Sequence, residues 1–305
     1  MNIIKFVEAY PDEKSCKLHF KTVREQDGIK CKKCGCEKHY WLQDKWQWQC
    51  SECRFRTTLR SGTMMENSKM PFRMWFLTMA FMSFTKKGLS ASEMQRQLGH
   101  NRYEPVWNMM HKIRQAMGNR DSLYQLEGSI EFDEGHFETE QNAAIRSNLK
   151  RGRGSQRQAN VGVMAESTPL EDIETGEKSS HCRYFKMKVL ESFEKQEINE
   201  IIQQNVNQTT IVFSDRSTSY VDISEFVEVH ITEKSDDNTT KTTLRWVHIA
   251  ISNAKRTLLG IYHKIKGKYL QLYLDEFCYK LNRRYFGERL FDRLLIAVSN
   301  NLVAN

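Results

Sequence analysis

The sequence predicts an α/β protein in which a mixed β-sheet with flanking helices follows a cysteine-rich module and a helical module. Three observations lead to this prediction. Five of the eight cysteines fall between residues 31 and 53, helical periodicity occupies residues 71–117, and strand-like alternation begins near residue 126. We therefore expect an N-terminal segment with the cysteine-rich module at 1–62, the helical module at 63–125 and the sheet domain at 126–305.

Composition excludes membrane and secreted classes. The chain has 305 residues, of which 39% are hydrophobic, so it can bury a substantial core. No run approaches the 18 or more apolar residues of a membrane helix, and the N-terminus lacks the apolar core of a signal peptide. We expect a cytosolic protein without a membrane partner.

Charge is divided unevenly along the chain. Residues 1–120 contain 22 Lys and Arg against 11 Asp and Glu, whereas residues 121–305 contain 24 against 27. All the excess positive charge is therefore N-terminal. This asymmetry predicts a front part that binds a polyanion, with a merely soluble basic face as the alternative, and a rear part that gathers carboxylates.

The clustered cysteines have the spacing of a zinc ribbon. Cys31 and Cys34 form one CxxC pair, and Cys50 and Cys53 form a second pair after a tryptophan-rich hairpin. Two such pairs can hold one Zn²⁺ tetrahedrally, and four thiolates leave no open position for substrate, so the predicted metal is structural. Free thiols or a redox pair are the alternative. Cys36 is expected to be a spare, although its exchange with Cys34 stays open.

Basic side chains surround this predicted ribbon. They are interleaved with aromatic residues and are suited to binding DNA phosphates, although zinc ribbons also dock proteins. The expected DNA contacts here are Lys32, Lys33, Arg54 and Arg56.

The next segment predicts a helix-turn-helix. Pro71 opens a core helix, Ser90–Leu98 follows with the pattern of a capping box, and Gly99 begins a turn before a helix over Arg102–Met117. The second helix of such a hairpin can lie on DNA, although helical hairpins are common without that role. The expected DNA contacts are Arg102, Lys112 and Arg114.

The rest of the chain has the element order of a ribonuclease H-like sheet. Three strands, a helix, two further strands and a late helix are expected. A flexible basic loop over Arg146–Arg157 supplies Arg151 and Arg153 as further candidate DNA contacts. The expected elements are a strand around Asp133, strands Asn160–Ala165 and Arg183–Leu190, helix Phe193–Gln204, strands Thr210–Asp215 and Phe226–Ile231, and helices Trp246–Leu259 and Lys268–Phe286.

Two carboxylates and one late helix make up a candidate catalytic site. Asp133 lies within the first strand, on the face opposite to Ile130 and Phe132, which are expected to be half-buried. Asp215 ends the strand that follows the first helix. Adjacent central strands would bring the carboxylates together, as a site for two divalent ions requires. On the late helix, His248 and Lys255 are seven residues apart and share a face, whereas Asn253 lies about 140° from His248.

These motifs together resemble a known family. The order of zinc ribbon, helix-turn-helix, "IEFDEGHFE", "VFSD" and "WVHIAISNAKRTLLGIYHKIKGKYLQLYLDEFCYKLNRR" is similar to bacterial insertion-sequence transposases with a zinc ribbon and an ISXO-type DDE domain, relatives of the Merlin transposons. The resemblance covers about residues 15–290. It implies a metal-dependent DNA strand transferase in which Asp133 and Asp215 are the first two acidic residues.

The sequence departs from that family pattern at the third position. When the chain is aligned on Lys255 and Arg256, His248 stands where glutamate is usual, and some branches have asparagine, for which Asn253 is the reserve. Imidazole suits Mn²⁺ better than Mg²⁺, so the metal could be either. Alternatively, His248 packs at the helix start and Lys255 is a solvated lysine instead of a phosphate ligand. Glu131 and Glu134 are either hydrogen-bond partners of the site or surface charges.

The expected function is a DDE-type transposase that binds the terminal inverted repeats of an insertion sequence and cleaves and transfers strands with two metal ions. Its partner would be double-stranded DNA, as element ends and as target, and pairing two ends implies a homodimer or larger assembly. The resemblance implies a bacterial cytoplasmic, nucleoid-associated protein. The alternatives are a DNA-binding regulator or inactive descendant without catalysis, and a structure-selective nuclease without strand transfer.

Overall fold

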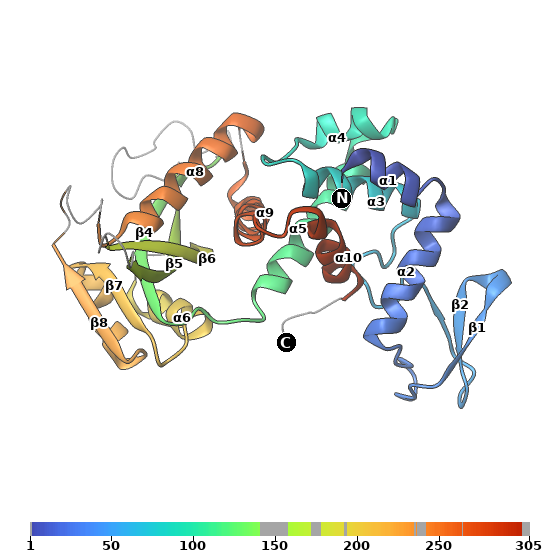
Figure 1. The fold of residues 1–305 in the computed structure, drawn as a ribbon, viewed down its shortest axis with the longest axis horizontal. Helices are drawn as coiled ribbons and strands as arrows, with labels where there is room; N and C mark the ends of the chain where they lie inside the picture. The colour runs from blue at the N-terminus through green and yellow to red at the C-terminus, as the bar shows by residue number, and fades with distance from the viewer. Residues whose placement is uncertain are drawn as a thin grey trace. The chain divides into compact units, whose positions relative to one another are not determined.

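The computed structural model describes residues 2–140, 158–171, 178–191, 194–234, 236, 242–263 and 265–300. The chain divides into two compact units (Figure 1). One combines Met1–Arg120 with the C-terminal segment that begins at Tyr285, and the other spans Asp121–Arg284. The expected sheet domain of 126–305 therefore differs from the observed unit at its C-terminal end.

The first unit is built from helices around a small antiparallel sheet. Helices α1 (Ile3–Ala9) and α2 (Glu13–Asp27) precede strands β1 (His39–Leu42), β2 (Gln47–Cys50) and β3 (Arg56–Thr58), with the short helix η1 (Gln43–Lys45) between β1 and β2. The chain continues as α3 (Phe72–Phe84), α4 (Ala91–Leu98) and α5 (Tyr103–Asp121). Gly99 ends α4 in the left-handed conformation at φ 61°, as the predicted turn required.

A helix that the sequence analysis did not predict completes this unit. After η5 (Gly287–Arg289), α10 (Leu290–Ser299) buries its apolar stripe, and the Phe291 ring lies 5.6 Å from Phe6 and 5.9 Å from Phe76. The Met64 N–H also donates to the Val298 carbonyl over 3.1 Å. These aromatic contacts explain why the segment after Tyr285 belongs to the N-terminal unit.

The second unit contains a five-stranded mixed sheet. Its strands are β4 (Ser129–Glu138), β5 (Gln158–Glu171), β6 (Lys178–Leu190), β7 (Ile211–Asp215) and β8 (Val229–Glu233), arranged in the order β6-β5-β4-β7-β8. The first three strands pair antiparallel, and β7 and β8 join β4 in parallel. This arrangement confirms the predicted ribonuclease H-like sheet.

Helices cover both faces of the sheet. Helix α6 (Lys195–Asn205) and the short helix η3 (Thr218–Glu225) pack on the face that carries Ile130 and Phe132, whereas α8 (Arg245–Tyr262) and α9 (Leu270–Asn282), which follows η4 (Gly267–Tyr269), cover the other (Figure 1). Ile130 and Phe132 are consequently fully buried, not half-buried as predicted. A strand covered on both faces buries both parities, so alternation understates its burial.

Helix α9 protects the exposed edge of β6 with side-chain amides. Asn282 accepts from the Phe185 N–H at 2.7 Å and donates to the Phe185 carbonyl at 2.9 Å. Gln271 accepts from the Val189 N–H at 2.8 Å and donates to the Met187 carbonyl at 2.9 Å. Both amides replace a neighbouring strand, which is one way to prevent unwanted pairing at a sheet edge.

Candidate active site and zinc centre

The two predicted carboxylates lie at equivalent positions on neighbouring strands. Strands β4 and β7 are parallel, with Ile130 opposite Val212 and Glu131 opposite Phe213. Two residues further along, the same register brings Asp133 beside Asp215, where β7 ends. The sheet therefore places both carboxylates at one end of its central strand pair.

Helix α8 brings His248 to the same place. The His248 Nε2 atom lies 3.4 Å from Asp133 Oδ2, and the side chains are 35% and 17% exposed, so solvent reaches both. Asp133 Oδ1 also accepts from the Glu134 N–H at 2.8 Å, and Asp215 Oδ1 accepts from the Ser217 N–H at 3.1 Å. Burial raises the pKa of the Asp133 carboxyl, opposed by the Glu134 N–H and by His248, and the negative charge of Asp215 adds to the rise.

The reserve candidate for the third position lies elsewhere. Asn253 is five residues beyond His248 on α8, and its Oδ1 accepts from Arg256 Nη2 at 2.9 Å. Among the described residues of helix α8, His248 is the one whose side chain pairs with Asp133 on strand β4.

Lys255 lies further along the same helix, beside a small cavity. Its Nζ atom is 5.7 Å from the centroid of the Phe137 ring. Seven residues of α-helix separate it from His248, or about 10 Å. The cavity has a volume of about 140 Å³, and its polar lining residues are His136, Glu138, Gln158, Lys255 and His263.

Glu131 is a buried part of this arrangement that the sequence analysis left undecided. It is 4% exposed, and its Oε2 atom accepts from the Trp246 N–H at 2.6 Å and from the Val247 N–H at 3.0 Å. Burial raises the pKa of this carboxyl to about 7, although the two N–H groups act against the rise. Its shared parity with Asp133 was the one sequence signal that pointed toward the site.

The sequence analysis did not identify Tyr220 as a neighbour of the two carboxylates. It follows β7 in η3, is 2% exposed, and packs against Phe132 with ring centroids 5.1 Å apart. Burial raises the pKa of its hydroxyl, and the charges of Glu134, Asp133 and Asp215 raise it further. No motif in the sequence marks this residue, because only the fold brings η3 to the carboxylates.

The ligand types at this end of the sheet suit a divalent cation. Two carboxylates and an imidazole are ligands of Mn²⁺, and a cation would relieve the repulsion between Asp133 and Asp215. The separation of Asp133 Oδ2 and His248 Nε2 is close to the roughly 3.0 Å expected between neighbouring ligands at about 2.1 Å from an octahedral ion. The residues therefore fit such an ion in charge and in ligand type.

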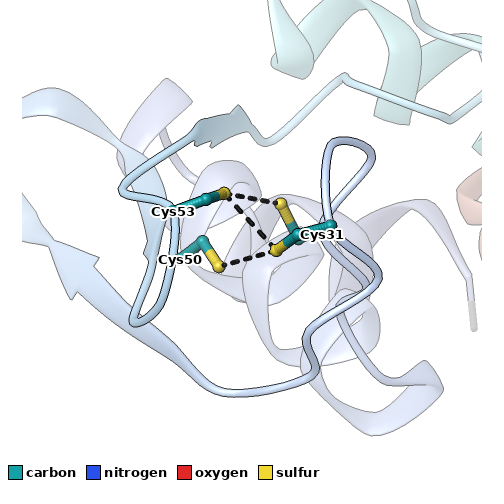
Figure 2. Close-up of side chains that lie close together, drawn as sticks. Cys31, Cys50 and Cys53 are labelled. Atoms are coloured by element: carbon teal, nitrogen blue, oxygen red, sulfur yellow. Dashed lines mark hydrogen bonds between the residues drawn. The ribbon is translucent and has the colours of Figure 1, made fainter.

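The four predicted cysteines form a closed cluster in the first unit. Their sulfurs all lie within 4.8 Å of one another, and in the described part of the chain no other group of three or more His, Cys, Asp or Glu meets that distance. Figure 2 shows Cys31, Cys50 and Cys53 directed to one centre. Three sulfur separations are 3.5, 3.5 and 3.4 Å, close to the roughly 3.8 Å of a tetrahedral site with Zn–S bonds of about 2.3 Å. The cluster fits a structural Zn²⁺.

Cys36 stays outside this cluster, as expected. Its sulfur lies 3.5 Å from Ser51 Oγ and 3.6 Å from the Lys38 carbonyl.

The tryptophans of the ribbon contact helix α2. Lys17, Lys21 and Arg24, which follow one face of that helix, lie 5.3, 5.0 and 5.7 Å from the rings of Trp46, Trp41 and Trp48 respectively. Trp48 Nε1 also donates to Glu25 Oε1 at 3.0 Å. Aromatic residues that looked suited to DNA thus have a packing role within the unit.

The predicted DNA contacts have unequal access to solvent. Five are exposed: Lys32, Lys33, Arg54, Arg56 and Arg102. Lys32 also pairs with Glu66 at 3.1 Å, and the half-buried Lys112 donates to the Glu66 carbonyl at 2.8 Å. Arg151 and Arg153 lie outside the described residues.

The expectation for Arg114 was wrong. Its side chain is 1% exposed, on the α5 face that carries the buried Met110, Ile113 and Met117. Its charge and its place on the second helix of the hairpin suggested a DNA contact, but the packing face of α5 includes this position.

Comparisons with known proteins identify the family of the chain through its second unit. The family model described as ISXO2-like transposase domain matches residues 125–282, more than half of the chain. No curated protein matches. A solved structure titled as a pre-cleavage Mos1 transpososome matches with 11% identity and a TM-score of 0.27, covering 70% of this chain and 75% of that one. Within the described residues, no helix has both the length and the apolar character needed to span a membrane.

Proposed function

Because this chain belongs to the ISXO2-like transposase family, we propose that it cleaves DNA at the ends of a mobile element and joins those ends to target DNA. Asp133, Asp215 and His248 would hold the divalent cations for this reaction. The observation that supports the proposal is the pairing of His248 with Asp133, together with the parallel register that puts Asp215, where β7 ends, on the strand beside Asp133.

The reaction consists of two in-line displacements at phosphorus. In the first, water attacks the phosphodiester at the element end, and the bond to the 3′-oxygen breaks to leave a 3′-hydroxyl. In the second, that hydroxyl attacks a target phosphodiester, so one P–O bond forms as another breaks. Two bound divalent ions would activate the attacking oxygen and stabilise the leaving oxygen.

The protein residues position the DNA for these steps. Asp133 and Asp215 supply negative charge where cations are needed, and His248 adds a neutral ligand on one side. Lys255, about 10 Å further along α8, is suited to a phosphate neighbouring the scissile one, with His136 and His263 beside it at the same cavity. The site would thereby orient the strand as well as hold the ions.

The N-terminal unit would bind the terminal inverted repeats of the element. Its basic excess supports this assignment, as do the exposed side chains of Lys33, Arg54, Arg56 and Arg102. The four-cysteine Zn²⁺ site would be structural, because it has no open coordination position. Since two element ends must be brought together, the active form would be a homodimer or a larger assembly on DNA.

A strand-cleavage assay tests the proposal. The full-length protein is incubated with duplexes that carry the inverted repeats flanking its gene, with Mg²⁺ or Mn²⁺, and nicked and joined products are resolved. Asp133→Asn and Asp215→Asn should each abolish both products, whereas Glu166→Gln, a buried carboxylate elsewhere in the sheet, should not.

Three outcomes would point elsewhere. Unchanged cutting by Asp133→Asn would refute the site. Specific binding of the ends without cutting in either metal would favour a DNA-binding regulator. Cutting of branched DNA without joined products would favour a structure-selective nuclease.

A further inference from the structure

We propose that Glu131 is a positioning residue that holds the start of helix α8 on strand β4 and thereby sets His248 against Asp133. The inference rests on the proposed function only where cleavage is the readout. Nothing in the sequence pattern requires this role, because an acidic residue two positions before Asp133 is equally compatible with a solvated strand face.

The contact is a helix cap supplied by a distant strand. The first N–H groups of an α-helix have no partner within the helix, and a nearby side chain usually accepts from them. At α8 the capping position is Leu244, which makes no side-chain cap. Glu131 Oε2 takes over this task through the N–H groups of Trp246 and Val247, at 2.6 and 3.0 Å. A carboxylate at this end also interacts favourably with the helix dipole.

The cap links the two halves of the site directly. Glu131 and Asp133 are two residues apart on β4, and Val247 and His248 are neighbours on α8. Moving the start of α8 relative to β4 would therefore change the 3.4 Å separation between Asp133 and His248.

A second contact fixes the same helix further along. A Cβ atom on Gly135 would lie only 3.3 Å from Ile251 Cγ1 and 3.0 Å from Phe137 Cε2. Residues 131, 133 and 135 have the same parity on β4, and each one faces α8. The cap and this close approach leave the helix little freedom to slide or tilt, so His248 is presented in one position.

The sheet offers a matched control for a purely structural role. Glu166 on β5 is also buried, at 5% exposed, and its Oε2 accepts from the Glu127 N–H at 3.0 Å. It therefore accepts from a backbone N–H as Glu131 does, but among the described residues it forms no hydrogen bond with helix α8. Loss of either carboxylate removes a buried hydrogen bond, and only loss of Glu131 should affect His248.

The experiment measures metal binding and cleavage in Glu131→Gln, Glu131→Ala and Glu166→Gln, with melting temperatures recorded for each. Mn²⁺ binding is followed directly by electron paramagnetic resonance of the full-length protein without DNA. We expect Glu131→Ala to weaken Mn²⁺ binding and to slow cleavage by about 10–100-fold, the range for residues that orient metal ligands. Because Glu131→Gln keeps a hydrogen-bond acceptor, it should lose less Mn²⁺ affinity and less cleavage activity than Glu131→Ala. Glu166→Gln should match the wild type in Mn²⁺ affinity.

A double-mutant cycle with His248→Ala decides whether Glu131 acts through His248. If it does, adding Glu131→Ala to His248→Ala should weaken Mn²⁺ binding no further. Equal losses of Mn²⁺ affinity from Glu131→Ala in both backgrounds, or a loss in Glu131→Ala no larger than that in Glu166→Gln, would overturn the proposal. If the wild type binds Mn²⁺ but cuts no DNA, the proposed function fails while the binding cycle still tests Glu131.

Discussion

Asp133 Oδ2 and His248 Nε2 lie 3.4 Å apart, so a carboxylate from the middle of strand β4 meets an imidazole from helix α8. The imidazole stands where the resembling family usually has glutamate. Because nitrogen ligands suit Mn²⁺ better than Mg²⁺, this pair predicts the metal preference of the enzyme.

Replacing His248 with glutamate should shift that preference. A third carboxylate supplies a hard oxygen ligand, so the ratio of cleavage rates in Mg²⁺ and in Mn²⁺ should rise by at least about tenfold in His248→Glu. Single-turnover cleavage in each metal measures the ratio. His248→Ala is the control and should slow cleavage in both. An unchanged ratio in His248→Glu would mean that His248 does not contact the metal.

Removing one zinc ligand should unfold the ribbon. In Cys50→Ser the cluster loses one of four sulfurs, and because Zn²⁺ binding supplies much of the folding free energy of small zinc modules, β1–β3 should lose their structure. Bound zinc is measured by atomic absorption, and the fluorescence of Trp41 and Trp48 reports on the sheet. Cys36→Ser should keep one zinc per chain, since Cys36 lies outside the cluster. Zinc loss from Cys36→Ser would instead assign Cys36 as a ligand.

Truncating Asn282 should destabilise the edge of the sheet. Asn282→Ala leaves the N–H and the carbonyl of Phe185 without their side-chain partner. At about 1–3 kcal/mol for each of the two buried groups left unsatisfied, the free energy of unfolding should fall by about 2–6 kcal/mol. Urea denaturation measures the change, with the exposed Gln204→Ala on α6 as the control. Equal stability of both variants would show that α9 does not protect β6 through this amide.

Lys186 should make the free energy of unfolding change with pH in the alkaline range. It is 3% exposed and donates to the Tyr124 carbonyl and to Asn205 Oδ1. Burial lowers the pKa of its ammonium group from 10.5 to about 8, and the positive charge of Lys188 adds to this. Between those values the unfolded chain binds more protons than the folded one, so the free energy of unfolding should rise with pH by about 3 kcal/mol.

In Lys186→Met, the free energy of unfolding should no longer show this rise with pH. Because other groups titrate in the same range, the measured quantity is the difference in unfolding free energy between the wild type and Lys186→Met, determined by urea denaturation at pH 8 and at pH 10.5. A difference that stays constant across this range would mean that Lys186 titrates normally.

Several features could be predicted because they depend on spacing or periodicity. The paired CxxC spacing predicted the four-sulfur cluster and the exclusion of Cys36, since ligand geometry limits the residues between two sulfurs. The succession of strand and helix patterns predicted the sheet. Within it, parallel neighbouring strands explain why Asp133 and Asp215 meet.

Other features depend on contacts between distant segments. The buried state of Arg114 follows from which face of α5 packs inward, and its charge suggested DNA contact although it lies on the apolar face with Met110 and Met117. Gln271 and Asn282 lie on a predicted helix, and only the packing of that helix shows that their amides pair with β6. Helix α10 joins the N-terminal unit through aromatic packing that its own sequence does not specify.

The sequence by itself determined the four clustered cysteines and the succession of strands and helices, because each depends on residue type and spacing along the chain, and it marked Asp133 and Asp215 as candidate ligands. Only the tertiary structure showed which of the two α8 candidates lies beside Asp133 and what holds that helix in place. Asn253 and His248 are both suitable ligands in the sequence, and the packing of α8 on β4 brings His248 to Asp133. Glu131, an ordinary acidic residue in the sequence, is buried as the cap of that helix, because two N–H groups at the start of α8 need an acceptor.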